Sequence, residues 1–153
     1  MGITAGKLHQ YLKFKLPAAW LCGVKLKELD RTEALVQVRF RWINQNPFRS
    51  MYFAVQSMAA ELSTGALMIK KIKECNKDIS FLVVNHQGSF SKKAIGLISF
   101  KCTDGEKIDT VLEKAIETGE GQIIRLSSIG TDENGEQVSS YEFEWSIKLR
   151  TTT

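Results

Sequence analysis

The stretch that decides the fold is residues 44–74, NQNPFRSMYFAVQSMAAELSTGALMIKKIKE. From Ser50 to Met68 it is almost continuously apolar, and its alanines, methionines and leucines favour a helix over a strand. Asn46-Pro47 marks a turn before the helix, and we expect the Ser50 hydroxyl to cap the first turn. A helix that is apolar on nearly all sides is buried, so this stretch predicts a core helix roughly 35 Å long.

One acid, Glu61, interrupts the apolar run. A buried carboxylate costs several kcal/mol unless it is paired, hydrogen-bonded or protonated. Ser57 lies four residues before it and Thr64 three after, so the three polar side chains share one helix face. Two interpretations stay open. Either Glu61 faces solvent or fastens a neighbouring strand, or it lines a pocket with a raised pKa, ready for acid–base chemistry.

The composition is that of an ordinary globular protein: 153 residues, 43% hydrophobic, 25% charged, net charge +4. The lysines are scattered, so no nucleic-acid partner is indicated. Cys22, Cys75 and Cys102 are odd in number and widely spaced, which favours free thiols in a reducing compartment. His9 and His86 are isolated, and we expect no metal site.

We expect a single domain over residues 1–153, in which residues 1–22 form an N-terminal helical extension. Lysines interrupt the apolar part of that extension, so it is no cleavable signal peptide, and no segment has the length and apolarity of a membrane span. A cytoplasmic location is therefore expected. Residues 3–21 predict an amphipathic helix, broken near Pro17, that docks over an end of the sheet. A helix bound to a membrane surface is the alternative.

Hydrophobic periodicity predicts the remaining elements. They are strands at 24–30, 33–43, 79–87 (mostly buried), 95–102, 122–131 and 137–150, and a helix at 105–118. Asn134-Gly135 is a strong signal for a hairpin between the last two strands. This order predicts an α+β fold in which a curved antiparallel sheet wraps around the one long buried helix, with an extra N-terminal helix and a short helix late in the chain.

That order resembles the hot-dog fold of acyl-CoA thioesterases and dehydratases. In small hot-dog thioesterases an Asn and a turn precede a His-Gly-Gly that opens the helix, and an Asp or Glu follows the His by nine residues. Here Asn46 precedes Tyr52 by six residues and Glu61 follows Tyr52 by nine. The sequence of residues 46–65, NPFRSMYFAVQSMAAELSTG, is most similar to a hot-dog subfamily carried as a domain of unknown function.

The resemblance implies an acyl-CoA thioesterase, with Glu61 as general base on a water or as nucleophile and Asn46 orienting the water or the carbonyl. Backbone amides at the helix start would form an oxyanion site, and nearby side chains would line the pocket. The substrate-binding candidates are Tyr52, Phe53, Ala54, Ser57 and Thr64.

The sequence departs from the family pattern because Tyr52-Phe53-Ala54 replaces His-Gly-Gly. A non-catalytic acyl- or acyl-CoA-binding or regulatory module on the same fold is therefore the alternative function. The dehydratase branch needs a histidine near the helix start, and none is present.

The resemblance also implies the partners. They are an acyl-CoA or acyl-carrier thioester, with coenzyme A as part of the substrate and no separate cofactor, and a second copy of the chain in a homodimer or a dimer of dimers. An open sheet edge would favour such pairing. Lys92 and Lys93 either meet the phosphates of coenzyme A or form a solvated face.

Overall fold

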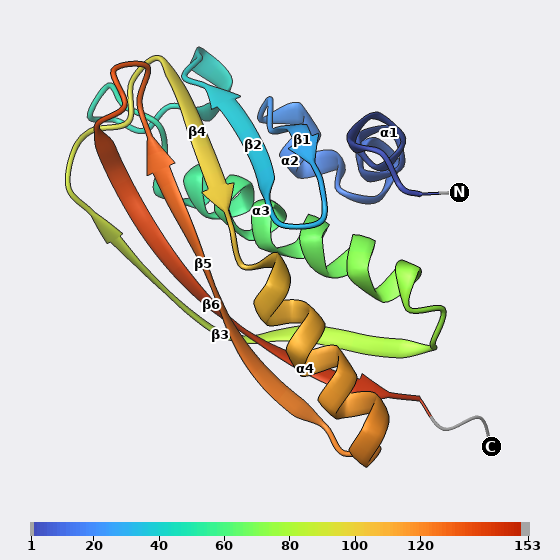
Figure 1. The fold of residues 1–153 in the computed structure, drawn as a ribbon. Coiled ribbons are helices and arrows are strands. Elements are labelled where there is room, and N and C mark those ends of the chain that lie inside the picture. The colour runs from blue at the N-terminus through green and yellow to red at the C-terminus, as the bar shows by residue number, and fades with distance from the viewer. Residues whose placement is uncertain (1, 151–153) are drawn as a thin grey trace.

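The computed structural model describes residues 2–150. Helices and strands alternate along the chain in the predicted order (Figure 1). The elements are α1 (Ala5–Lys15), α2 (Pro17–Leu21), β1 (Lys25–Leu29), β2 (Ala34–Arg39), the 3₁₀ helix η1 (Trp42–Asn44), α3 (Phe53–Glu74), β3 (Ile79–Phe90), β4 (Leu97–Cys102), α4 (Gly105–Thr118), β5 (Gln122–Thr131) and β6 (Gln137–Leu149).

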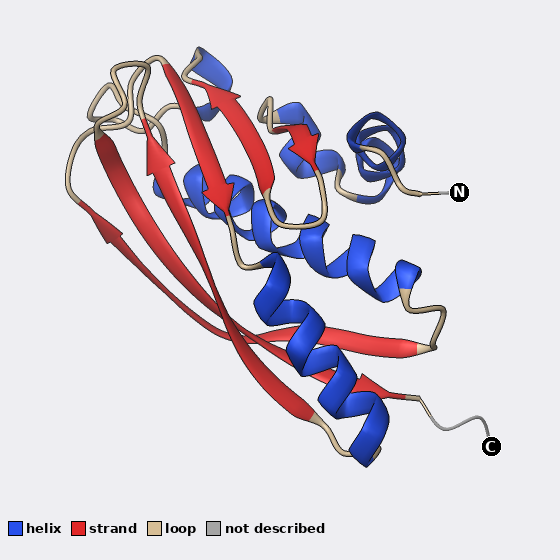
Figure 2. Ribbon diagram, viewed as in Figure 1, coloured by secondary structure: helices blue, strands red, loops and turns tan. Residues whose placement is uncertain are grey.

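The strands form one antiparallel sheet in the order β1-β2-β4-β5-β6-β3. The sheet curves around α3, and α4 packs beside α3 against β5 and β6 (Figures 1 and 2). This is the predicted hot-dog fold, in which α3 is the central helix enclosed by the curved sheet.

The inner face of β6 supplies much of the core, as its alternation predicts. Tyr141, Phe143, Trp145 and Ile147 are all buried, whereas the residues between them are at least partly exposed. Most of α3 is buried as well. Burying apolar surface of this kind contributes about 25 cal/mol per Å², so the packing of α3 against the inner face of the sheet, chiefly β2, β4 and β5, is a principal source of stability.

The two edges of the sheet differ. Along β1, the backbone amide of Leu26 donates to Nδ1 of His9 on α1 (3.3 Å), so the N-terminal helix covers this edge. At the opposite edge, β3 pairs only with β6, and most of its residues are exposed, including Leu82 (66%) and Val84 (49%). The prediction of a mostly buried strand at 79–87 is therefore wrong, because its apolar residues lie at an open edge.

The start of the core helix also differs from the prediction. α3 begins at Phe53, and Ser50 is not its N-cap. The backbone before Phe53 is held in an extended form, because the Met51 amide donates to Ala94 (2.9 Å) and the Tyr52 amide to Asn44 (2.9 Å). Because these two bonds hold the backbone extended, the helix does not start at Ser50.

Other boundaries shift for local reasons. The strand predicted at 33–43 ends at Arg39, where the chain turns into η1. The strand predicted from residue 95 starts at Leu97, since Gly96 has a positive φ of 78°. The predicted break near Pro17 is confirmed, because α1 ends at Lys15 and α2 starts at Pro17.

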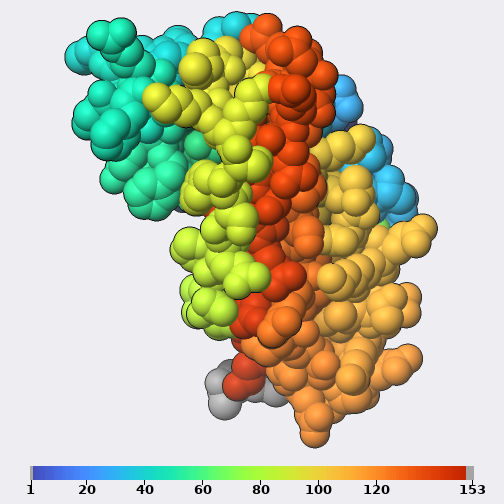
Figure 3. All heavy atoms as spheres, turned by 90° about the vertical axis from the view of Figure 1, so that its left-hand side faces the viewer, coloured from blue at the N-terminus to red at the C-terminus, as the bar shows by residue number. Residues whose placement is uncertain are grey.

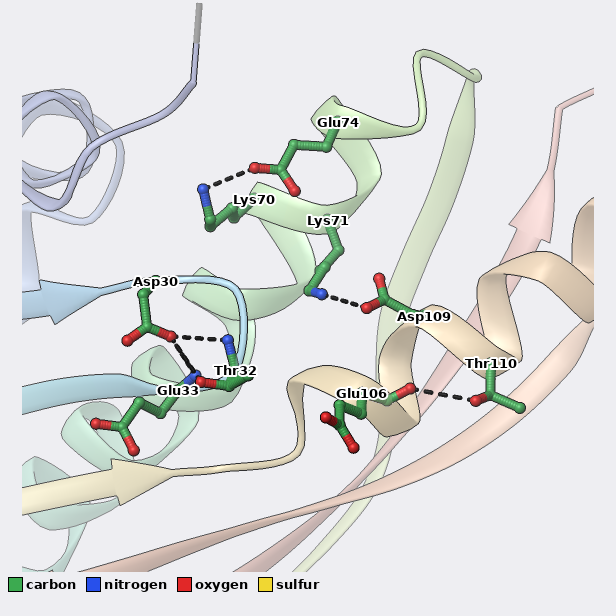
Figure 4. Close-up of polar contacts among 9 residues, drawn as sticks. All are labelled: Asp30, Thr32, Glu33, Lys70, Lys71, Glu74, Glu106, Asp109 and Thr110. Atoms are coloured by element: carbon green, nitrogen blue, oxygen red, sulfur yellow. Dashed lines mark hydrogen bonds and ion pairs between the residues drawn. The ribbon is translucent and has the colours of Figure 1, made fainter.

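Two lysines near the end of α3 are buried and paired (Figure 4). The side chain of Lys70 is 9% exposed and binds Glu74 one turn later, at 2.7 Å. The side chain of Lys71 is 3% exposed and binds Asp109 of α4 at 2.5 Å. The second ion pair joins α3 to α4 at the edge of the core, where the Asp109 side chain is 38% exposed.

We predict that Asp109→Ala lowers the free energy of unfolding by about 2 kcal/mol, because it leaves the Lys71 ammonium buried without a partner. Asp78→Ala is the control, since its ion pair with Arg150 is exposed and should change stability by less than about 0.5 kcal/mol. In urea denaturation, Lys71→Met combined with Asp109→Ala should recover most of the loss. Equal effects of Asp109→Ala and Asp78→Ala would contradict the prediction.

Candidate functional site

The loop before α3 forms one wall of a groove of about 540 Å³, and the end of β3 with the following residues forms the other. In Figure 3 the loop and the start of α3 (teal) lie beside the segment after β3 (yellow). Aromatic side chains dominate the lining. Phe48, Tyr52, Phe53 and Phe90 all contribute and are about half or more exposed. The groove is therefore an open, mostly apolar surface beside a helix N-terminus.

The backbone amides at the start of α3 are available to a ligand. Tyr52, in the N-cap position, makes no side-chain capping bond. Within residues 2–150, no acceptor takes the amide protons of Phe53 or Ala54. Unpaired first-turn amides carry the positive end of the helix dipole, which favours an oxyanion.

Asn46 organises the loop rather than pointing a free amide group at the groove. Its Oδ1 accepts from the amides of Phe48 (2.9 Å) and Ser50 (3.2 Å). Its Nδ2 donates to the Ser50 hydroxyl (3.0 Å) and to the Met51 carbonyl (3.3 Å). Both Nδ2 protons are thus used inside the loop.

The predicted polar face of α3 exists, and it meets β6. The Ser57 hydroxyl lies 3.1 Å from the Tyr141 hydroxyl, and the Trp145 indole donates to the Thr64 hydroxyl at 3.1 Å. Glu61 lies between these two contacts along the helix. Ser57 and Thr64 therefore fasten α3 to the sheet on either side of the acid.

The Glu61 side chain is half-buried, and its carboxyl group makes no ion pair and no hydrogen bond with any residue in the described part of the chain. No fully buried side-chain oxygen in that part of the chain lacks a partner, so the Glu61 carboxyl oxygens keep some contact with solvent. A methyl group placed on Gly65 would lie 3.4 Å from both Glu61 Oε1 and the Trp145 ring, so the missing side chain there lets acid and indole pack closely. Burial raises the pKa of Glu61 from 4.5 to about 6, and no nearby cation offsets this effect.

The structure separates the predicted residues into two groups. Asn46, Tyr52 and Phe53 line the groove, whereas Glu61 does not. Eight residues separate Phe53 from Glu61 on α3, which is about 12 Å along a helix axis. One copy of the chain therefore does not bring the free amides and the carboxyl group to one point.

The sequence did not identify the residues that complete these two groups. Tyr141 and Trp145 contact the polar face of α3, and Phe90 closes the groove with an edge-to-face contact to Phe53 (6.4 Å between ring centroids). The alternating aromatics of the last strand were the available signal, but the pattern does not reveal their partners on the helix.

Two classes of site find no support within residues 2–150. No three His, Cys, Asp or Glu side chains gather where they would hold a metal ion. No helix there has the length and apolarity needed to cross a membrane.

We predict that Glu61→Gln stabilises the fold in a pH-dependent way. Because the folded-state pKa of Glu61 is raised above the unfolded value, stability is highest below pH 4.5 and falls as pH rises through about 6. The amide should therefore gain about 2 kcal/mol at pH 8 and almost nothing at pH 4.

Urea denaturation across this pH range measures the difference. Glu117→Gln is the control, since that exposed side chain on α4 should show no pH-dependent gain. A constant effect of Glu61→Gln from pH 4 to pH 8 would show that the carboxyl group is not destabilised by burial.

Comparison with solved structures shows the same fold in several bacterial proteins. A protein of unknown function from Pseudomonas aeruginosa, described as a probable thioesterase, has 22% identity and a TM-score of 0.84, covering 98% of this chain and 99% of that one. A protein of unknown function from Chlorobaculum tepidum has 15% identity and a TM-score of 0.82, covering 95% and 94%. A thioesterase from Haemophilus influenzae has 10% identity and a TM-score of 0.74, covering 97% and 93%.

A comparison with curated proteins gives no match. The family model described as "Domain of unknown function (DUF4442)" matches residues 5–147, which is nearly the whole chain. The chain, which has the hot-dog fold, therefore belongs to the DUF4442 family.

Proposed function

We propose that this protein hydrolyses an acyl thioester, with Glu61 as the catalytic carboxylate. The observation that carries the proposal is a half-buried carboxyl group on the core helix whose pKa burial raises to about 6, which has no ion-pair or hydrogen-bond partner within residues 2–150, and whose oxygens still reach solvent. Such a group is costly to stability, and perturbed acids of this kind gather at functional sites. The thioesterase description of two neighbours of the same fold supports the substrate class.

In the proposed reaction, ionised Glu61 takes a proton from a water molecule, whose oxygen attacks the thioester carbonyl carbon. The resulting oxyanion accepts from the amides of Phe53 and Ala54. The intermediate then breaks its C–S bond, the thiolate leaves and takes a proton from Glu61, and the products are a carboxylic acid and a thiol. Direct attack by Glu61 on the carbonyl, followed by hydrolysis of the anhydride, gives the same products.

A pKa near 6 suits this role. Most Glu61 side chains are ionised at pH 7, and the carboxylate is a stronger base than an ordinary glutamate. The acyl chain would lie in the groove beside Phe48 and Phe90, whose exposed rings supply apolar contact area.

We further propose that the complete site forms between two copies of the chain. The free amides and Glu61 are about 12 Å apart along α3 in one copy. A two-fold axis beside α3 would bring Glu61 of one subunit towards the helix start of the other. The open edge at β3 supplies backbone groups for that pairing. Asn46 would then hold the loop that presents the amides.

A non-catalytic acyl-binding module is the second candidate. Two observations favour it. The bulky Tyr52 and Phe53 side chains stand where small hot-dog thioesterases have His-Gly, and both Asn46 Nδ2 protons are used within the loop. Such a protein would bind thioesters in the same groove without turnover.

We predict that the wild type releases thiol from at least one member of a panel of short, medium, long and aryl acyl-CoAs. Glu61→Ala and Glu61→Gln should each lower kcat at least a hundredfold, which corresponds to about 3 kcal/mol. In the wild type, kcat/KM should rise with pH through about 6 and then level off, because the base must be ionised. The Glu117→Gln control should match the wild type.

Each contrary result has a distinct meaning. Absence of turnover by a folded protein that still binds acyl-CoA would favour the binding module. Turnover that survives Glu61→Ala would show that another group is the base.

We predict a dimer at micromolar concentration that depends on β3. Sedimentation velocity should give the mass of two chains for the wild type. Leu82→Lys with Val84→Lys should yield monomers, because like charges then meet along the edge. Ile123→Lys on β5 is the control for an added charge at an exposed apolar residue, and it should remain dimeric. A monomeric wild type would overturn the proposed shared site.

A further inference from the structure

A second groove, of about 200 Å³, lies where β1, β2 and the start of β4 adjoin. Four cationic side chains line it, two from β1 and two from β2 or the residues just after it. They are Lys25, Lys27, Arg39 and Arg41. Concentrating four positive charges in so small a space creates a local potential far stronger than the net charge of +4 would imply.

Most of this charge is not neutralised by the protein. Arg39 pairs with Glu133 at 3.2 Å, and both side chains are more than half exposed. Within residues 2–150, Lys25, Lys27 and Arg41 have no acidic partner. Their field reaches the neighbouring helix, where burial, followed by the charges of Lys25, Lys27 and Lys13, lowers the pKa of His9.

The groove is shaped in advance for an anion. Gly23 has a φ of 84°, and a side-chain carbon on it would lie 2.1 Å from Nη2 of Arg41, so the guanidinium occupies the space that a side chain would fill. Lys25 stands opposite Gln37 on the paired strand, and Gln37 is held by a hydrogen bond to Ser99 (3.0 Å). The floor of the groove is therefore a fixed sheet surface.

This set of groups suits phosphate. The guanidinium group of Arg41 can donate two parallel hydrogen bonds to two phosphate oxygens. The lysine ammonium groups add positive charge and can approach a phosphate from many directions. The volume accommodates one or two phosphate groups but is too small for a nucleic-acid backbone track.

Short stretches of chain connect this groove to the acyl groove. Leu97 lines the basic groove, and Ala94, three residues earlier, lines the acyl groove and binds the Met51 amide. Arg41 directly precedes η1, which leads into the loop that forms the other wall of the acyl groove. Both grooves thus lie at the same end of the sheet.

We propose that the basic groove binds one or two of the phosphates of coenzyme A while the acyl thioester lies in the apolar groove. This inference rests on the proposed function and deepens it, because it names coenzyme A, rather than an acidic carrier protein, as the acyl carrier.

The structure gives Lys92 and Lys93 other partners. Lys92 pairs with Asp132 (2.7 Å) and Glu136, and Lys93 donates to the Phe48 carbonyl (3.0 Å). The charge of Lys92 is therefore neutralised, whereas Lys93 is a single cation that lines the acyl groove.

Binding to the full chain tests the proposal without requiring turnover. Calorimetric titration with coenzyme A and with adenosine 3′,5′-bisphosphate should show binding that weakens with added salt. Lys25→Ala with Arg41→Ala should weaken both interactions at least tenfold. Lys114→Ala with Lys148→Ala removes the same charge from exposed positions elsewhere and should change them less than twofold. Thermal unfolding of both double variants checks that each is folded.

Kinetics with two substrates give the second arm. For an acyl-CoA, the Lys25→Ala and Arg41→Ala double variant should raise KM at least tenfold and leave kcat unchanged. For the same acyl group on pantetheine, which has no phosphate, KM should not change. If coenzyme A binds as expected but no acyl-CoA is hydrolysed, the phosphate site stands and only the proposed hydrolysis is contradicted.

Three outcomes would overturn the proposal. The first is an equal loss of affinity in the two double variants, which would indicate only a general charge effect. The second is inorganic pyrophosphate binding as tightly as coenzyme A, which would indicate a free polyphosphate ligand. The third is a loss of turnover on an acyl carrier protein but not on acyl-CoA, which would make the groove a protein-docking site.

Discussion

The close approach of α3 to the sheet is the constraint on which the remaining structure depends. Ala59, Ala60, Ser63 and Ala66 are fully buried on the helix, and such small side chains let a helix backbone lie near the strands. The contact is also directional, because Ser63 bonds Ser128 on β5 at 2.7 Å. Apolar packing alone would allow α3 to rotate or slide, whereas buried hydrogen bonds fix one register. The position of the grooves follows from that register.

The charged residues on the core helix differ in whether they have a partner of opposite charge. Lys70 and Lys71 are each joined to a carboxylate, so their burial is compensated. Glu61 is on the same helix and has no such partner within residues 2–150. Each paired lysine lies near the end of the helix, and the unpaired acid lies near its middle, on the face towards β6. That contrast sets Glu61 apart from the structural charges of the core.

The sequence predicts the fold well where periodicity reports burial directly. The long apolar run at 44–74 and the alternating last strand identify the two layers that pack together, and the family resemblance supplies the topology. The same periodicity led to the wrong prediction that residues 79–87 are mostly buried. An apolar strand has the same sequence pattern whether its own chain covers it or it lies at an open edge of the sheet. Ser50 was misjudged for a related reason, since the backbone bonds that delay the helix come from Ala94, far along the chain.

The candidate site was predictable only in part. Helical spacing correctly placed Ser57, Glu61 and Thr64 on one face, because that relation lies within one element. The contacts of that face with Tyr141 and Trp145 depend on the curvature of the sheet, which no local pattern encodes. The basic groove was missed for the same reason, since its lysines and arginines come from separate strands and look scattered in sequence.

The two edges of the sheet differ in whether another chain could pair with them, and this difference limits the size of an assembly. A β-sheet with two open edges can add copies without end, as in fibrils, whereas here α1 lies along β1 and leaves only β3 to receive a neighbour. In the proposed two-fold dimer, each chain would use its open β3 edge for pairing, and no further copy could be added to the sheet. In such a dimer the N-terminal helix would end the assembly at two chains, and its removal would expose β1 and allow further chains to add.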